Sequence, residues 1–205
     1  DNEFERARRL IEHGADVNAI SDPGGAGCTP LSRACDWTQF FNTADGNLEL
    51  VRLLVERGAE LELPIKHGRT ALAIAARRNS PSVLLFLLER GAKFEPGPDT
   101  PLMEPILCSV VQAYWPNAKS LQALLERGAN INLAAQPGLK TALHHAVTSR
   151  VPLSTCQFLL KRGANPNARD ADGQTPLHLA AAIARSHRDE ELVPLLVQFG
   201  ADVAL

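Results

Sequence analysis

Aromatic residues and long apolar runs are scarce in this sequence. Phe, Trp and Tyr make up 5 % of the 205 residues, with two Trp and one Tyr, so aliphatic side chains must build the core. No apolar run approaches the ~20 residues that a membrane-spanning helix needs. The formal net charge of −2 indicates neither a general nucleic-acid binder nor a protein attracted to membranes. We therefore expect no nucleic acid and no membrane among the partners.

Cysteine is also used sparingly. The four cysteines form no CxxC pair and no Cys/His cluster at metal-ligand spacing: Cys28, Cys35, Cys108 and Cys156. We expect buried, reduced thiols, which are typical of an intracellular protein in the cytoplasm or the nucleus. The sequence shows no signal-peptide pattern and begins with residues that favour a helix, as in a segment of a longer protein.

Residue patterns that carry catalysis are missing as well. The glycine cluster at residues 24–27 lacks the lysine and the preceding strand of a phosphate-binding loop. No Ser/His/Asp arrangement and no pair of carboxylates has a spacing that supports catalysis. His144 and His178 fit better as hydrogen-bond partners of neighbouring backbone than as metal ligands or catalytic bases. The sequence therefore predicts a protein that is not an enzyme and has no cofactor.

The prominent feature that the sequence does contain is a repeat. Gly-Ala dipeptides close leucine-rich stretches at intervals of 33 to 44 residues: Gly14-Ala15, Gly58-Ala59, Gly91-Ala92, Gly128-Ala129, Gly163-Ala164 and Gly200-Ala201. Intervals of this size are typical of stacked repeat architectures, in which each unit packs only on its neighbours. Such a protein offers a long binding surface instead of one enclosed pocket.

Each repeat is predicted to contain two helices. Threonine followed by Pro-Leu or Ala-Leu opens a short alanine-rich helix, at Thr29, Thr70, Thr141 and Thr175. The Thr side chain can cap such a helix, and proline is accepted at its first position. A leucine-rich second helix follows. The Gly of Gly-Ala then lies just beyond the helix end, where a left-handed backbone favours glycine.

The fourth repeat offers two registers for its first helix. Thr100-Pro101-Leu102 imitates the opening, but a helix from there would hold Pro105 in its interior, at a cost of about 3 kcal/mol. An opening at Glu104 instead puts Pro105 at the first helical position. We therefore predict the opening at Glu104 and an extended segment over residues 96–103.

Together these features resemble the ankyrin-repeat family. The family has a period of about 33 residues and the signature Thr-Pro-Leu-His-x-Ala, which residues 175–180 match. The resemblance covers residues 3–205 and implies an all-α solenoid of stacked helix–turn–helix units with β-hairpin-like fingers. We predict a single domain over residues 1–205. Its first repeat would be represented only by its second helix, from Glu3 to His13, followed by five further repeats.

Several repeats are longer than the one from Thr70 to Gly91. The additional residues fall between the two helices, at 37–47, 114–119 and 184–191. Long helix–helix connections lie on the surface and often carry function. Half of the ten aromatic residues are found there: Trp37, Phe40, Phe41, Tyr114 and Trp115. These rings either fold back over the helix ends or form a contact patch for a partner, and both interpretations stay open.

The resemblance also implies that finger tips and first helices line a concave binding face. At the third repeat this face would carry Lys66, His67, Arg69, Arg77 and Arg78, and neighbouring repeats would add Arg33, Lys140 and His145. Clustered guanidinium groups pair well with carboxylates. The face is therefore either an ordinary solvated surface or a docking groove for an acidic peptide.

Three asparagines share one position in the repeat. Asn18, Asn132 and Asn167 each follow a leucine by eight residues. In some ankyrin-repeat proteins the asparagine of this finger position is hydroxylated. An asparagine there can equally bond the backbone of the turn, and we favour this structural role.

The resemblance and the basic residues together predict a monomeric, non-catalytic scaffold that binds a partner protein or acidic peptide. The candidate partner-binding residues are Arg33, Trp37, Lys66, His67, Arg69, Arg77, Arg78, Tyr114, Trp115, Lys140 and His145. Three alternatives stay open. The chain could be a substrate-recruiting or regulatory module of a larger enzyme or ubiquitin-ligase-type protein, a methyl-lysine reader of histone tails built on Trp37 or Trp115, or an architectural spacer.

Overall fold

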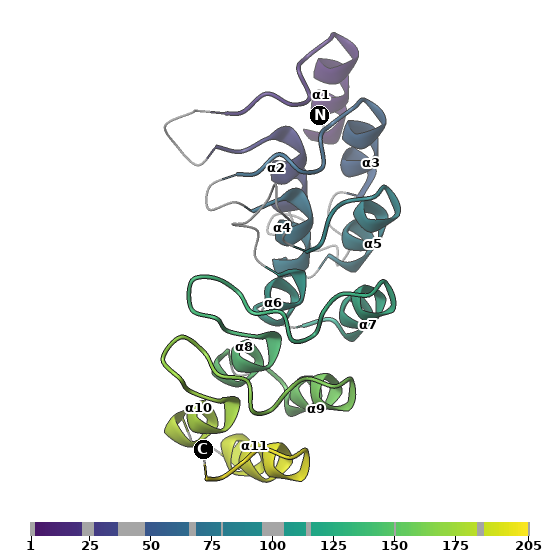
Figure 1. Cartoon of the computed structure of the whole chain (residues 1–205). Helices are drawn as coiled ribbons and strands as arrows, with labels where there is room; N and C mark the ends of the chain where they lie inside the picture. Colours follow the sequence, from purple (N-terminus) through teal and green to yellow (C-terminus); the bar gives the residue numbers. More distant parts are fainter. Residues whose placement is uncertain are drawn as a thin grey trace. The chain divides into compact units, whose positions relative to one another are not determined.

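The chain folds into α-helices joined by short turns and fingers (Figure 1). The computed structural model describes residues 3–21, 27–36, 48–65, 69–78, 80–95, 105–113, 116–149, 151–183 and 187–204. Over these residues it contains eleven α-helices and no β-sheet, which confirms the predicted fold class. The chain divides into two compact units, Asp1–Met103 (unit 1) and Glu104–Leu205 (unit 2).

Unit 1 contains five helices in two layers. They are α1 (Glu3–Glu12), α2 (Pro30–Asp36), α3 (Leu48–Glu56), α4 (Ala71–Arg77) and α5 (Pro81–Glu89). The short first helices α2 and α4 pack against each other, and the second helices α1, α3 and α5 form the other layer (Figure 1). Fully buried leucines such as Leu31, Leu54 and Leu72 fill the space between the layers.

Unit 2 repeats this arrangement with six helices. They are α6 (Ile106–Val111), α7 (Ala118–Glu126), α8 (Ala142–Thr148), α9 (Leu153–Lys161), α10 (Pro176–Ile183) and α11 (His187–Gln198). The first helices α6, α8 and α10 contact one another in order, and α9 contacts α11 (Figure 1). Alanines of the first helices, such as Ala142, Ala146 and Ala180, are buried because neighbouring helices approach closely.

The predicted caps are present at the first helices. The Thr70 hydroxyl accepts a hydrogen bond from the backbone N–H of Ala73 at 3.4 Å. Thr29 and Ser32 exchange bonds, the Thr29 hydroxyl accepting from the Ser32 backbone and the Ser32 hydroxyl from the Thr29 backbone. These contacts satisfy N–H groups that have no partner inside the helix. The glycines that follow the second helices adopt the expected left-handed backbone, with φ between 86° and 90°.

Hairpin-like fingers precede three of the first helices. Each is closed by a single antiparallel bridge, Ser21 with Cys28, Ile65 with Arg69, and Ala135 with Lys140. In unit 2 the finger tip at Gly138 also accepts a hydrogen bond from the Ala171 backbone of the next repeat, at 3.0 Å. This finger is therefore bonded to the next repeat of unit 2.

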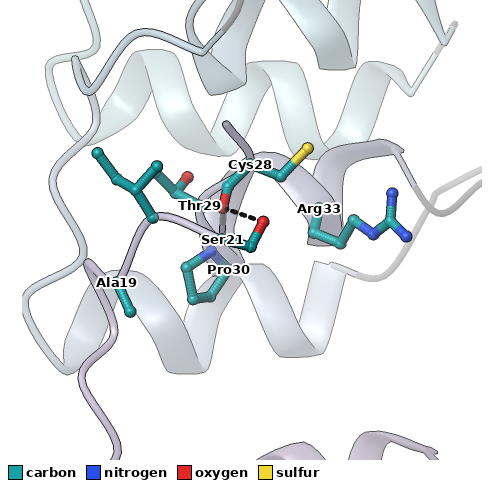
Figure 2. A pocket seen from close by; sticks show the side chains of 7 residues that line it. Ala19, Ser21, Cys28, Thr29, Pro30 and Arg33 are labelled. Atoms are coloured by element: carbon teal, nitrogen blue, oxygen red, sulfur yellow. Dashed lines mark hydrogen bonds between the residues drawn. The ribbon is translucent and has the colours of Figure 1, made fainter. Parts of the chain in front are cut away.

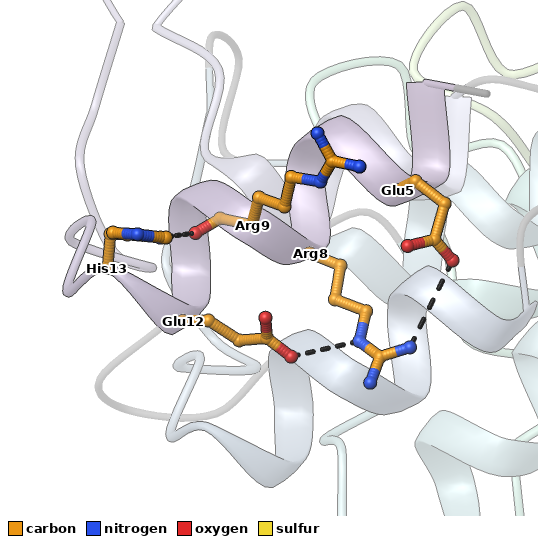
Figure 3. Close-up of polar contacts among 5 residues, drawn as sticks. All are labelled: Glu5, Arg8, Arg9, Glu12 and His13. Carbon is orange, nitrogen blue, oxygen red and sulfur yellow. Dashed lines mark hydrogen bonds and ion pairs between the residues drawn. The ribbon is translucent and has the colours of Figure 1, made fainter. Parts of the chain in front are cut away.

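The outer face of α1 carries charged side chains. Arg8 lies between Glu5 and Glu12, at 4.0 Å and 2.9 Å (Figure 3). The His13 ring contacts the Arg9 carbonyl at the C-terminal end of the helix, at 2.7 Å. The helix ends one residue before the predicted His13 and is the second helix of its repeat, packed on α3.

The predicted start of α6 was wrong by one residue. Pro105 is the N-cap residue of α6 and not its first helical residue, with ψ 127° and a carbonyl that accepts from Ser109. Proline breaks no helical hydrogen bond either as the N-cap residue or as the first helical residue. The cost of an interior proline therefore could not decide between these two positions. Glu104 itself, like residues 96–103, lies outside the described residues.

Two of the predicted connections, 114–119 and 184–191, are shorter than predicted. Helix α7 begins at Ala118 and so includes Lys119, and α11 begins at His187 within the expected connection 184–191. Helix α11 is long enough to contain Pro194 in its interior. The connection was predicted from the greater length of this repeat, and a longer α11 takes up part of the additional residues instead.

Candidate partner-binding face

Unit 1 places the arginines predicted for the third repeat at the two ends of α4. Arg77 is the last residue of α4, and Arg69 closes the finger just before the Thr70 cap. Because α4 packs on α2, these side chains belong to the same pair of first helices as Arg33. Arg78 reaches back to α2 and pairs with Asp36 at 2.5 Å, so it is an ion-pair partner within the array as well as a member of the face.

Arg33 is exposed on α2. Its guanidinium forms no ion pair or hydrogen bond with any of the residues that the structure describes. A guanidinium carries five N–H donors.

Arg33 lines two separate hollows of unit 1. One lies along the first finger, has a volume of about 550 Å³ and includes Ala19, Ile20 and Cys28 (Figure 2). The other, about 210 Å³, lies between α1, α2 and α3 and includes Leu10 and Val17. Pro30 and Arg33 line both. The sequence reasoning missed these hollows, because their walls come from helices and a finger that only packing brings together.

In unit 2 the predicted residues Lys140 and His145 are half-buried, and the Lys140 backbone and the His145 ring contact neighbouring residues. The Lys140 carbonyl accepts from the Ala135 backbone at 2.8 Å and faces the Cys108 thiol at 3.7 Å. The Nδ1 atom of His145 lies 3.3 Å from the Gln112 side-chain nitrogen. Next to Lys140, Leu139 is exposed at the finger tip with φ 52°, a conformation that non-glycine residues rarely adopt.

The remaining predicted contact residues lie outside the described part of the chain. They are Trp37, Lys66, His67, Tyr114 and Trp115. Whether the aromatic side chains are lids or contacts stays a prediction.

The histidines of the signature position have the structural role expected of them. His144 is fully buried; its Nδ1 faces the Thr141 hydroxyl at 2.9 Å, and its Nε2 faces the Gln174 carbonyl of the next finger at 3.2 Å. Burial lowers the pKa of His144, opposed by the bond to Gln174 and the charge of Asp170. The imidazole therefore links two repeats in its neutral form.

The asparagines of the shared position link successive turns. Asn132 donates to the Gly163 carbonyl at 3.2 Å and accepts from the Asn165 backbone at 2.7 Å. Asn18 makes the equivalent pair of bonds with Gly58 and Glu60, and Asn167 with Gly200 and Asp202. The prediction that these three asparagines bond turn backbone is confirmed.

The cysteines occur as free thiols, three of them buried and Cys28 half-buried. Across the described ranges, His, Cys, Asp and Glu form no group of three that could hold a metal ion. No described helix has the length and apolar character needed to cross a membrane.

Comparison with known proteins places the chain in a family. Residues 1–97 and 107–205 match the family described as ankyrin repeats (3 copies). The B-cell lymphoma 3 protein homolog of Mus musculus is 33 % identical over 160 residues, which cover 77 % of this chain and 34 % of that protein. The nuclear factor NF-kappa-B p105 subunit of Gallus gallus is 32 % identical over 134 residues, 65 % of this chain and 13 % of that protein. The chain thus spans about a third or less of these relatives.

Solved structures agree with this match. The ankyrin repeat domain of Bcl-3 has a TM-score of 0.68 and 30 % identity, covering 98 % of this chain and 82 % of that one. The human ASB11 ankyrin repeat domain has a TM-score of 0.78 at 24 % identity. The match covers 100 % of this chain and 86 % of that one, and it supports the fold. Ankyrin repeats are a protein–protein interaction module. The chain belongs to the ankyrin-repeat family.

Proposed function

We propose that this chain is a non-catalytic scaffold that binds an acidic segment of a partner protein through the first-helix face of unit 1. This face comprises residues 27–36 and 69–78. The observation that carries the proposal is its charge: these residues include four arginines and one acidic residue, Asp36. These two segments therefore carry more positive than negative formal charge, and Asp36 pairs with Arg78.

Exposure and geometry support an acidic partner. Arg33 is exposed, and Arg69 and Arg77 are half-buried with their stems against the array. Guanidinium groups form bidentate hydrogen bonds with carboxylates. A half-buried arginine loses less conformational entropy on binding than a fully exposed one would. We further propose that the protein acts as a monomer inside the cell.

Affinity capture from cell lysate with quantitative mass spectrometry tests the proposal. The bait is the whole chain, wild type or with Arg69→Glu and Arg77→Glu. The matched control carries Arg57→Glu and Lys161→Glu, which reverse two exposed charges near the ends of second helices. Circular dichroism melts confirm that each bait is folded.

We expect proteins captured by the wild type to be lost from the Arg69/Arg77 variant and retained by the control. Retention of every partner by a folded Arg69/Arg77 variant would refute the proposed face. Loss from both variants alike would point to net charge and not to this surface.

A further inference from the structure

An ion pair joins the C-terminal ends of α2 and α4 within the first-helix face of unit 1. Asp36 is the last residue of α2, and Arg78 is the C-cap residue of α4. The Asp36 Oδ1 atom accepts a hydrogen bond from the Arg78 Nε atom at 2.5 Å. The Arg78 backbone N–H is bonded to the carbonyls of Ile74 and Ala76. Both the backbone and the side chain of Arg78 are therefore held in place.

The ion pair uses only one of the three guanidinium nitrogens of Arg78. Arg78 bonds Asp36 through Nε, and its two terminal nitrogens make no hydrogen bond or ion pair with any residue that the structure describes. These two nitrogens carry all the N–H donors of the group except the one on Nε. The side chains of Arg78 and Asp36 are 35 % and 39 % exposed, so the pair lies at the surface of the array.

Stability alone does not account for this ion pair. Pairs between side chains as exposed as these contribute little to the free energy of unfolding. Asp36 is also the one acidic residue within 27–36 and 69–78, segments that include four arginines. A carboxylate at this position lowers the positive charge of a face that we propose binds an acidic segment. Its contact with the Arg78 Nε atom gives it a different role, which is to orient the guanidinium.

We propose that Asp36 is a positioning residue for partner binding, which fixes the Arg78 side chain so that its terminal nitrogens bind a carboxylate of the partner's acidic segment. Arginine binds a carboxylate through two parallel N–H···O bonds, and these require a defined orientation of the guanidinium. A side chain that is already ordered loses less conformational entropy when the bonds form. This proposal rests on the proposed function and names Arg78 as a direct contact of the partner.

Net charge and positioning predict opposite effects for Asp36→Ala. If net charge decides, the loss of a carboxylate makes the face more basic, and binding of an acidic peptide tightens. If Asp36 orients Arg78, the same change frees the guanidinium, and binding weakens. The fold should tolerate the change, because a carboxylate at the C-terminal end of a helix is unfavourable to the helix dipole. The sign of the change in affinity therefore separates the two explanations.

The test is a fluorescence-anisotropy titration of the whole chain at low salt with labelled hexaglutamate, and with labelled hexaglutamine as the control peptide. The protein variants are Asp36→Ala and Arg78→Lys, of which the second keeps the charge but loses the planar group. Glu60→Ala is the charge-matched control, because it removes an exposed carboxylate from the turn after α3. NMR spectra of the arginine side chains report the Nε atom and the terminal nitrogens of Arg78 separately.

We expect binding of hexaglutamate to weaken about threefold to tenfold with Asp36→Ala and with Arg78→Lys, the effect of about one hydrogen bond. Glu60→Ala should bind as the wild type does. In the wild type, hexaglutamate should shift the signals of the Arg78 terminal nitrogens. In Asp36→Ala, the Arg78 Nε signal should differ from that of the wild type before any peptide is added.

Equal or tighter binding by a folded Asp36→Ala protein would overturn the proposal. So would binding of hexaglutamate that leaves the signals of the Arg78 terminal nitrogens unchanged, a result that decides the question even if Asp36→Ala does not fold. If the Arg69→Glu and Arg77→Glu changes abolish binding while Asp36→Ala does not weaken it, the proposed function stands and only the role of Asp36 fails. Wild-type protein that binds hexaglutamate no better than hexaglutamine would count against both.

Discussion

At the residue scale, the turns after the second helices require glycine because their backbone is left-handed. Gly163 has φ 90°, and a Cβ built on it would meet no heavy atom within 4 Å. The space is open, so the requirement is one of backbone conformation and not of packing. The same holds at Gly58, Gly91, Gly128 and Gly200.

Replacing Gly163 by alanine is therefore expected to lower the free energy of unfolding by about 1 kcal/mol, through left-handed backbone strain alone. Gly163→Asn should cost less, because asparagine tolerates this conformation better. Urea unfolding of the three proteins measures the order. An alanine variant as stable as the wild type would contradict the backbone explanation.

His144 is expected to make stability depend on pH. Burial lowers its pKa in the folded chain, so the unfolded chain takes up this proton at a higher pH than the folded chain does. The free energy of unfolding should then fall as the pH drops below about 6.5 and stay constant above it, with a loss of up to about 1 kcal/mol at pH 5.5. A protonated Nδ1 could also no longer accept a hydrogen bond at Thr141.

Urea unfolding at pH 7.5 and 5.5 checks this expectation, with His144→Gln as the variant that cannot titrate. The wild type should lose more stability on acidification than the variant does. Equal losses in the two proteins would assign the pH dependence to other groups.

At the scale of elements, the asparagine bridges join each turn to the next. The equivalent position four residues after Gly58 is occupied by Glu62, whose Oε1 accepts from the Lys93 backbone at 2.7 Å. The other carboxylate oxygen of Glu62 is buried without a hydrogen-bond partner. A carboxylate cannot donate to a carbonyl as Asn132 does, so this bridge is incomplete.

Opposite changes at these two positions should have opposite effects. Glu62→Asn is expected to raise the free energy of unfolding by about 1 kcal/mol, by removing an unsatisfied oxygen and adding a donor. Asn132→Asp should lower it by about 1–2 kcal/mol, because it leaves the Gly163 carbonyl without its donor. Thermal melts of both variants give the comparison. Shifts of the same sign in the two variants would contradict the bridge interpretation.

Elements could be predicted from the sequence where the signal is local. The Thr caps and the glycines after the second helices follow from residues close in the chain, and both are observed. The start of α6 could not be fixed because proline is tolerated at more than one position, and the start of α11 because additional residues in a repeat can lengthen a helix as well as a connection. The pairing of Arg78 with Asp36 joins residues 42 positions apart, and only the packing of α4 on α2 reveals it.

At the scale of the whole molecule, helices contact partners within a repeat or in the adjacent repeat of the same unit, such as α2 with α4 and α8 with α10. Such an array presents its first helices and its second helices as separate surfaces. The basic residues singled out above belong to the first-helix surface of unit 1, whereas Arg52 and Arg90 of the second-helix layer lie over the Phe86 ring at 4.6 Å each. Partner binding should therefore protect one surface and leave the other unchanged.

The most direct test of the binding face is hydrogen–deuterium exchange of the chain with and without a partner recovered by affinity capture. We predict slower exchange in residues 27–36 and 69–78, where the arginine-bearing fingers and first helices lie, and unchanged exchange in α3 and α5. Protection confined to α3 and α5, with residues 27–36 and 69–78 unaffected, would contradict the proposed function.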